Sequence, residues 1–102
     1  MNGQKFAFNG YLPIDKTEKK ATLKKLERLS FEQNQTQLFI ETPYRNTALV
    51  ETALQSLSPA TKFGIAVDLT LSTEWVKVKR VGDWKKTKLP NLHKRPAIFL
   101  IG

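Results

Sequence analysis

The spacing of apolar residues alternates between strand-like and helix-like along the chain. Short apolar segments predict strands near residues 6–12, 37–41, 63–67, 74–80 and 97–101. Apolar residues at helical spacing predict two main helices, over 15–29 and 42–57. We expect a short helical or irregular turn at 82–84 and an exposed loop over 85–95. This order predicts an α/β fold: one domain, residues 1–102, with a mixed, roughly five-stranded sheet.

The first predicted helix has a clear beginning and one apolar face. Asp15, followed three residues later by Glu18, has the form of a capping box, in which each side chain bonds the other's backbone N–H. Leu23, Leu26 and Leu29 follow at helical spacing. We therefore expect this helix to lie on the sheet, with its cations in water. Those cations are Lys16, Lys19, Lys20, Lys24, Lys25 and Arg28.

The next strand and helix meet at a polar junction. Leu38, Phe39 and Ile40 are consecutive apolar residues, which predicts a strand covered on both faces. Thr42 as N-cap and Pro43 in the first turn predict the helix start. The helix is expected to carry its apolar stripe over residues 49–57.

Composition limits the classes of protein that the chain can represent. It has 102 residues, 40% of them hydrophobic, and a formal net charge of +8. It contains no cysteine, which excludes disulfides and cysteine metal sites and fits a reducing compartment, so we expect a cytoplasmic protein. The apolar stretches are too short for a membrane span.

The positive charge is concentrated near the C-terminal end. Residues 75–95 hold eight Lys or Arg residues and one acid, Asp83, together with Trp75 and Trp84. Basic residues interleaved with aromatic ones suit a protein that binds a phosphate backbone. The alternative interpretation is a solvated, lysine-rich surface that serves solubility.

The common catalytic patterns are not found in the sequence. His93 is the single histidine and stands in the basic loop, where a surface role is favoured. No Cys/His/Asp cluster has metal-ligand spacing, and no glycine-rich nucleotide loop is present. We therefore assign no catalytic residue and no metal ligand.

Three motifs in a fixed order carry a family resemblance. They are Phe-Ala-Phe-Asn-Gly-Tyr-Leu-Pro at 6–13, Phe-Ile-Glu-Thr-Pro-Tyr-Arg at 39–45 and Ala-Val-Asp-Leu-Thr at 66–70, closed by residues 96–102. Together they resemble the C-terminal domain of the tetrapyrrole (corrin/porphyrin) methylase superfamily. The similarity is greatest to its branch that methylates a ribose of small-subunit ribosomal RNA.

The resemblance implies one half of an S-adenosyl-L-methionine-dependent methyltransferase, whose N-terminal domain is absent from these residues. It implies that residues at strand ends contact the cofactor: Ile40, Glu41, Thr42, Ala66, Asp68, Leu69, Thr70, Pro96 and Ala97. It also implies substrate contacts by Tyr11, Tyr44 and Arg45. Physical reasoning alone leaves another interpretation open, in which Thr42 and Pro43 only cap the helix and Arg45 pairs with Glu41.

Two departures from the motifs affect the expected substrate. Val67 and Leu71 stand where the ribosomal RNA branch has an arginine and a lysine. The methyl acceptor therefore stays open between RNA and a tetrapyrrole. Expected partners are the missing N-terminal domain and a second copy of the chain, with no membrane. We expect the chain alone to be inactive, with an apolar patch at Ile40, Ala66 and Leu69. The alternative function is a non-catalytic, basic RNA-binding α/β module.

Overall fold

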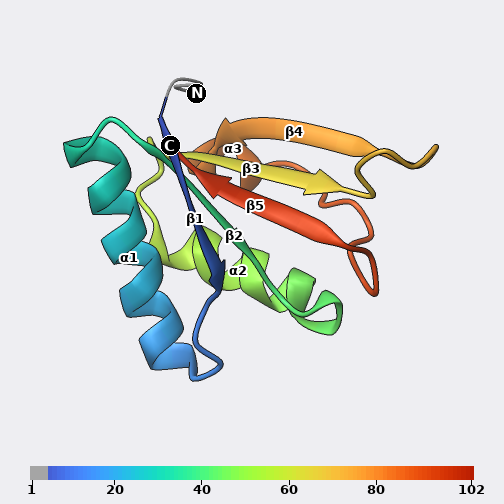
Figure 1. Ribbon diagram of the computed structural model, residues 1–102, viewed down its shortest axis with the longest axis horizontal. Helices are drawn as coiled ribbons and strands as arrows, with labels where there is room; N and C mark the ends of the chain where they lie inside the picture. The colour runs from blue at the N-terminus through green and yellow to red at the C-terminus, as the bar shows by residue number, and fades with distance from the viewer. Residues whose placement is uncertain (1–4) are drawn as a thin grey trace.

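The computed structural model describes residues 5–102 and confirms the predicted order of elements (Figure 1). Among these residues, no helix has both the length and the apolar character needed to cross a membrane. The elements are β1 (Phe6–Tyr11), α1 (Lys16–Glu32), β2 (Thr36–Ile40), the 3-10 helix η1 (Pro43–Arg45), α2 (Asn46–Ser56), β3 (Lys62–Val67), β4 (Trp75–Arg80), α3 (Val81–Trp84) and β5 (Ala97–Ile101).

The five strands form one mixed sheet in the order β1-β2-β5-β3-β4. β1 and β2 are parallel, whereas β5 lies between β2 and β3 and is antiparallel to both. β4 pairs antiparallel with β3 and forms one edge. β1, β2 and β3 consequently end at the same edge of the sheet, and β5 begins there.

Local interactions fix where the first strand and helix end and begin. Gly10 has a φ of 68°, next to an irregularity in the pairing of β1 with β2. Only glycine adopts this left-handed conformation without steric cost. One Asp15 carboxylate oxygen accepts a hydrogen bond from the Glu18 backbone N–H at 3.0 Å. This is the expected first half of the capping box.

The second helix begins differently from the prediction. Thr42 is the N-cap of η1, with Pro43 in the first turn, but its side chain makes no capping hydrogen bond. Instead, a Glu41 carboxylate oxygen accepts the Thr42 backbone N–H at 2.8 Å. α2 itself starts at Asn46. The predicted position of the cap is therefore confirmed for η1, but the Thr42 side chain makes no capping bond, and the Arg45 backbone N–H donates to the Thr42 carbonyl at 2.7 Å instead.

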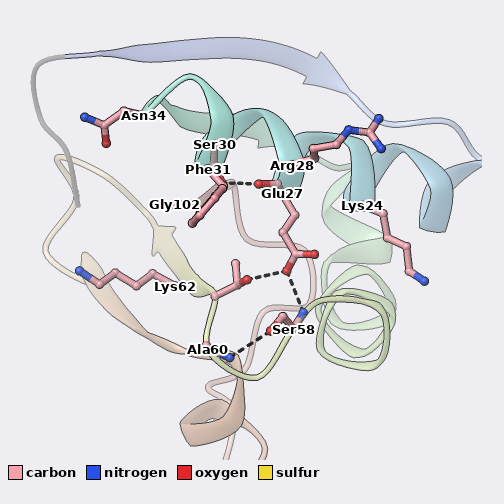
Figure 2. A pocket seen from close by; sticks show the side chains of 11 residues that line it. Lys24, Glu27, Arg28, Ser30, Phe31, Asn34, Ser58, Ala60, Lys62 and Gly102 are labelled. Atoms are coloured by element: carbon pink, nitrogen blue, oxygen red, sulfur yellow. Dashed lines mark hydrogen bonds between the residues drawn. The ribbon is translucent and has the colours of Figure 1, made fainter.

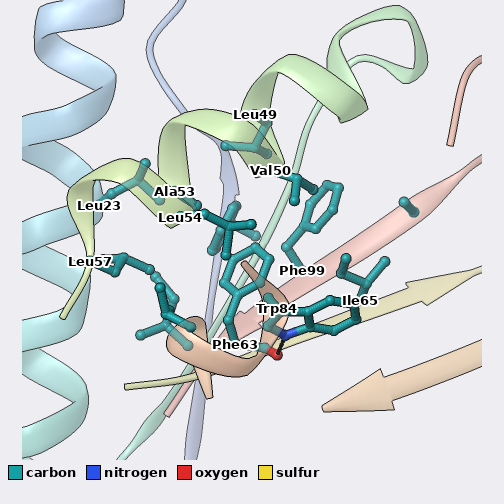
Figure 3. Close-up of a cluster of buried hydrophobic side chains, with 14 of the residues drawn as sticks. Leu23, Leu49, Val50, Ala53, Leu54, Leu57, Phe63, Ile65, Trp84 and Phe99 are labelled. Atoms are coloured by element: carbon teal, nitrogen blue, oxygen red, sulfur yellow. Dashed lines mark hydrogen bonds between the residues drawn. The ribbon is translucent and has the colours of Figure 1, made fainter. Parts of the chain in front are cut away.

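The core lies between one face of the sheet and the helices (Figure 3). Three aromatic rings from adjacent strands, Phe39, Phe63 and Phe99, pack together with centroid separations of 5.7–6.5 Å. The helices cover them with aliphatic side chains, and burial of this apolar area is the main favourable term for folding. The covering residues are Leu23, Leu26, Leu49, Val50, Ala53, Leu54 and Leu57.

The opposite face of the sheet has no helix over it among the described residues. Phe6 and Phe8 on β1 are 64% and 61% exposed, and Val76 on β4 is 55% exposed. Leu38 and Ile40 are only partly buried. The prediction that β2 is covered on both faces is therefore wrong, since both main helices pack on the side of Phe39.

The segment after β4 is less exposed than predicted. Leu92 is buried, and Asn46 of α2 donates hydrogen bonds from Nδ2 to the carbonyl oxygens of Leu92 and Arg95 at 3.1 and 2.7 Å. Trp84 is 1% exposed and donates from Nε1 to the Phe63 carbonyl at 2.6 Å. The expectation of an exposed loop over 85–95 therefore fails at Leu92, which belongs to the core together with Trp84 just before the loop, whereas Lys85, Lys86 and Lys94 are exposed.

We predict that Trp84→Phe lowers the free energy of unfolding by about 2 kcal/mol, measured by urea denaturation. The change removes the Nε1 hydrogen bond and leaves a small cavity. The matched control is Trp75→Phe, because Trp75 packs against Trp84 at 6.2 Å but is only half-buried. Its expected loss is about 1 kcal/mol or less. Equal losses in the two variants would contradict this assignment of Trp84 to the core.

Candidate ligand cleft at the strand ends

A hollow of about 310 Å³ lies where β1, β2 and β3 end and β5 begins. The strand register places Tyr11 beside Ile40, Ile40 opposite Ile98, and Ile98 opposite Ala66. We call this hollow the cleft. Its lining residues are Tyr11, Ile40, Glu41, Pro43, Ala66, Asp68, Leu69, Leu71, Pro96, Ala97 and Ile98.

Most of the residues predicted to contact cofactor or substrate line this cleft. The four that do not are Thr42, Tyr44, Arg45 and Thr70. A ligand role for any of the twelve stays a prediction, since placement in one hollow does not identify a ligand. Three lining residues, Pro43, Leu71 and Ile98, were not among the predicted contacts, although the alternation along 97–101 places Ile98 on the face of Ile40 and Ala66.

A buried ion pair supports the end of β2. Lys19 Nζ of α1 lies 2.6 Å from Glu41 Oε2, and the two side chains are only 8% and 3% exposed. The other Glu41 oxygen holds the Thr42 backbone N–H. Glu41 therefore pairs with Lys19 and not with Arg45, and the expectation that Lys19 lies in water is wrong. The pair fixes the strand end at the cleft to α1.

A second charged cluster joins the two loops of the cleft. Asp68 Oδ2 accepts hydrogen bonds from the Thr73 hydroxyl and from Arg95 Nε, both at 2.8 Å. Arg95 also donates to the carbonyl oxygens of Asn91 and Thr73 at 2.7 and 3.1 Å. The Asp68 backbone N–H donates to the Pro96 carbonyl at 3.0 Å. These bonds tie the loop after β3 to the segment before β5.

The electrostatics of this cluster favour ionised Asp68. The hydrogen bonds from Thr73 and from Arg95 hold the pKa of Asp68 below its ordinary value, with a further contribution from the Arg95 charge. Burial acts in the opposite direction and is outweighed. The carboxylate therefore stays charged and compensated inside the wall of the cleft.

The loop after β3 is held in an uncommon backbone conformation. Asp68 and Thr70 have φ angles of 52° and 69°. A left-handed conformation is costly for a β-branched residue such as Thr70. The Thr70 backbone N–H donates to a Glu74 carboxylate oxygen at 2.9 Å. Together with the Asp68 bonds, this contact holds the loop in its strained shape.

The two remaining predicted substrate residues lie away from the cleft hollow. Arg45 lines a separate hollow of about 360 Å³ together with residues of α1 and α2. Tyr44 is exposed, its ring lies 6.2 Å from that of His93, and Lys94 Nζ lies 5.9 Å above it. The structure therefore brings Tyr11 into the cleft and leaves Tyr44 and Arg45 outside it.

Solved methyltransferases have a similar fold. The chain aligns over 98% of its length with the methyltransferase CobJ, at a TM-score of 0.54 and 17% identity, and covers 41% of that chain. It also aligns over 100% of its length with a uroporphyrin-III C-methyl transferase from Thermus thermophilus complexed with S-adenyl homocysteine. The TM-score is 0.55, the sequence identity is 13%, and the chain covers 44% of that protein. No protein-family model and no curated protein sequence matches the chain.

At these identities the likeness establishes the fold. The chain is a single α/β domain that matches the C-terminal part of tetrapyrrole methylases, and it spans less than half the length of those structures. The structures named are tetrapyrrole methyltransferases. They do not support the prediction that the chain is most similar to the ribosomal RNA branch. The Val67 and Leu71 departures likewise give that branch no support.

We predict strong coupling between Lys19 and Glu41 in a double-mutant cycle. Lys19→Met should lower the free energy of unfolding by about 3 kcal/mol, because it leaves a buried carboxylate without its cation. Adding Glu41→Leu should recover part of that loss, so the two effects are not additive. Lys20→Met, one residue along α1, is the control and should change stability by about 0.5 kcal/mol or less. Strict additivity would contradict the ion pair.

We predict that Arg95→Gln raises the pKa of Asp68, measured by NMR titration of the carboxyl carbon. Because the folded pKa lies below that of the unfolded chain, Asp68 stabilises the fold above the unfolded pKa. That contribution is lost as the pH falls through the folded pKa. The variant should therefore lose less stability on acidification. Arg80→Gln, at an exposed position on β4, should leave the titration unchanged; equal shifts in both variants would refute the contact.

Proposed function

We propose that this chain forms the C-terminal wall of the cofactor cleft in an S-adenosylmethionine-dependent methyltransferase of the tetrapyrrole methylase kind. The observation that carries this proposal is the cleft at the strand ends, which is where open α/β sheets hold their ligands. The likeness in fold to a protein solved with S-adenyl homocysteine supports it. The residue motifs support it independently.

The chemistry of the cleft suits the adenosine part of such a cofactor. Its two carboxylates are compensated within the domain, Glu41 by Lys19 and Asp68 by Arg95. The remaining lining is largely apolar, so the cleft favours a neutral ring over a charged group. The residues proposed to flank the ring are Ile40, Ala66, Leu69, Leu71, Pro96 and Ala97.

The proposed division of labour needs no catalytic side chain from this domain. When bound, S-adenosylmethionine supplies an electrophilic methyl group on its sulfonium. The domain's residues then bind and orient the cofactor and exclude water from it. Tyr11, at the rim, is proposed to contact the methyl acceptor. A tetrapyrrole or an RNA would serve as acceptor, since both carry anionic groups that suit a chain of net charge +8.

The cleft is small for a complete cofactor site. Its 310 Å³ lies at the lower end of the range for ligand pockets. We therefore propose that an N-terminal domain supplies a second wall, and that the present chain alone has no methyltransferase activity. A second copy of the chain is a further proposed partner. The alternative function, a non-catalytic RNA-binding module, draws its support from the cations of α1 described below.

We predict weak but localised binding of S-adenosylhomocysteine to the isolated chain. In a nitrogen–proton NMR titration, shifts should concentrate at the amides of residues 40–42, 66–71 and 97–98. The expected dissociation constant is about 1 mM or weaker, because half of the contacts are missing. Ala66→Leu should weaken binding at least about fivefold by filling the cleft.

Val78→Leu is the matched control for this titration. It adds apolar volume on the same face of the sheet, but Val78 on β4 does not line the cleft. It should leave binding unchanged. Undiminished binding by Ala66→Leu, or shifts confined to the outer face of α1, would overturn the proposed cofactor site.

A further inference from the structure

The outer side of α1 carries an ordered row of cations. Lys16, Lys20, Lys24 and Arg28 follow each other at intervals of four residues. Such a row forms a gently inclined ridge on a helix, with a rise of about 6 Å between neighbours. Consecutive phosphates along a nucleic-acid strand have a similar separation. We call these four residues the α1 ridge.

The ridge is costly for an isolated helix. Like charges at four-residue intervals repel each other. The ion pairs among the described residues are Lys19–Glu41 and Asp68–Arg95, so neither of them neutralises the α1 ridge. An anionic partner that follows the helix would remove this repulsion.

A hollow of about 710 Å³ lies at the C-terminal end of the ridge, beside the start of β3 and the end of β5 and so at the opposite end of these strands from the cleft. Lys24 and Arg28 extend from one side of it and Lys62 from the other (Figure 2). Its one acid, Glu27, accepts the Ser58 backbone N–H at 2.7 Å and also accepts the Thr61 hydroxyl. The rim is therefore cationic.

An exposed aromatic ring completes this surface. Phe31 lines the hollow and is 89% exposed, three residues beyond Arg28 on α1. At helical spacing it falls on the same side of the helix as Lys20 and Lys24. An aromatic ring beside a row of cations is the arrangement that holds an unpaired base next to its backbone phosphates.

We propose that the α1 ridge, Phe31 and Lys62 form a binding surface for single-stranded RNA. The cations contact successive phosphates, and a base stacks on Phe31. RNA is the occupant because its unpaired stretches present free bases, whereas duplex DNA hides them. This surface is separate from the cleft and does not depend on its function.

The expected RNA surface over residues 75–95 is less suitable. Trp84 is buried, and Lys79 already contacts the Trp84 ring and the Thr87 hydroxyl. Arg95 is engaged by Asp68. An anionic membrane is also a weaker fit, because the apolar side of α1 is buried against the sheet and leaves Phe31 as the apolar contact.

The test compares two triple variants of equal charge in binding to a labelled oligouridine of about 12 nucleotides. Lys20→Gln, Lys24→Gln and Arg28→Gln together should weaken binding at least about tenfold at low salt. They should also reduce the slope of log affinity against log salt by about 2. The control set is Lys77→Gln, Lys85→Gln and Lys86→Gln, all at exposed positions. It should change affinity by about twofold or less.

Phe31→Ala tests the stacking contact separately from charge. We expect a loss of about fivefold or more in RNA affinity. Phe8→Ala, which removes another exposed ring on the open sheet face, should have no effect. Circular dichroism checks that each variant is folded. Two further measurements test competition by duplex DNA and binding to phosphatidylserine vesicles.

Four outcomes would overturn the proposal. They are no RNA binding at low salt, equal losses in the two triple variants, equal competition by duplex DNA, and vesicle binding that needs Phe31 while RNA binding does not. The first would leave the ridge as a solubilising surface, and the second would indicate diffuse attraction by net charge. None of the four bears on the cofactor titration.

Discussion

The antiparallel insertion of β5 between β2 and β3 is the constraint on which the rest of the structure depends. Because β5 runs against its neighbours, its first residues lie beside the last residues of β2 and β3. This pairing places Ile98 between Ile40 and Ala66, and so brings together residues from three strands that are far apart in the chain. It also pairs Phe99 with Phe39, and Phe99 packs diagonally against Phe63 in the core. One register thus forms both the cleft and the aromatic centre.

Charge is distributed differently at the two ends of the sheet. At the cleft, each acid has a cation from elsewhere in the domain, so the wall that it presents is close to neutral. The ion pairs found among the described residues do not include the cations of the α1 ridge. A neutral, apolar hollow favours an uncharged ring, whereas a cationic ridge attracts anionic groups. The two surfaces can therefore act independently on one small domain.

Local patterns in the sequence predict the elements well and their long-range contacts poorly. The strand and helix order follows from apolar spacing, and the Asp15 cap follows from a four-residue motif. Family motifs pointed to Ile40 and Ala66, which the fold does bring together. The sequence did not identify Lys19 as the partner of Glu41 or Arg95 as the partner of Asp68. Each cation stands in a basic stretch of sequence typical of an exposed surface, and only tertiary packing brings it to its carboxylate.

The strained loop after β3 indicates how the cleft meets a ligand. Left-handed residues at 68 and 70 would relax if they were free, yet the Asp68 and Glu74 contacts hold them. The loop is therefore already ordered before any ligand arrives, and binding need not supply the free energy to order it. Weak affinity of the isolated chain would then reflect contacts that a second wall should provide. The strain itself is offset within the domain, by hydrogen bonds from Thr73 and Arg95.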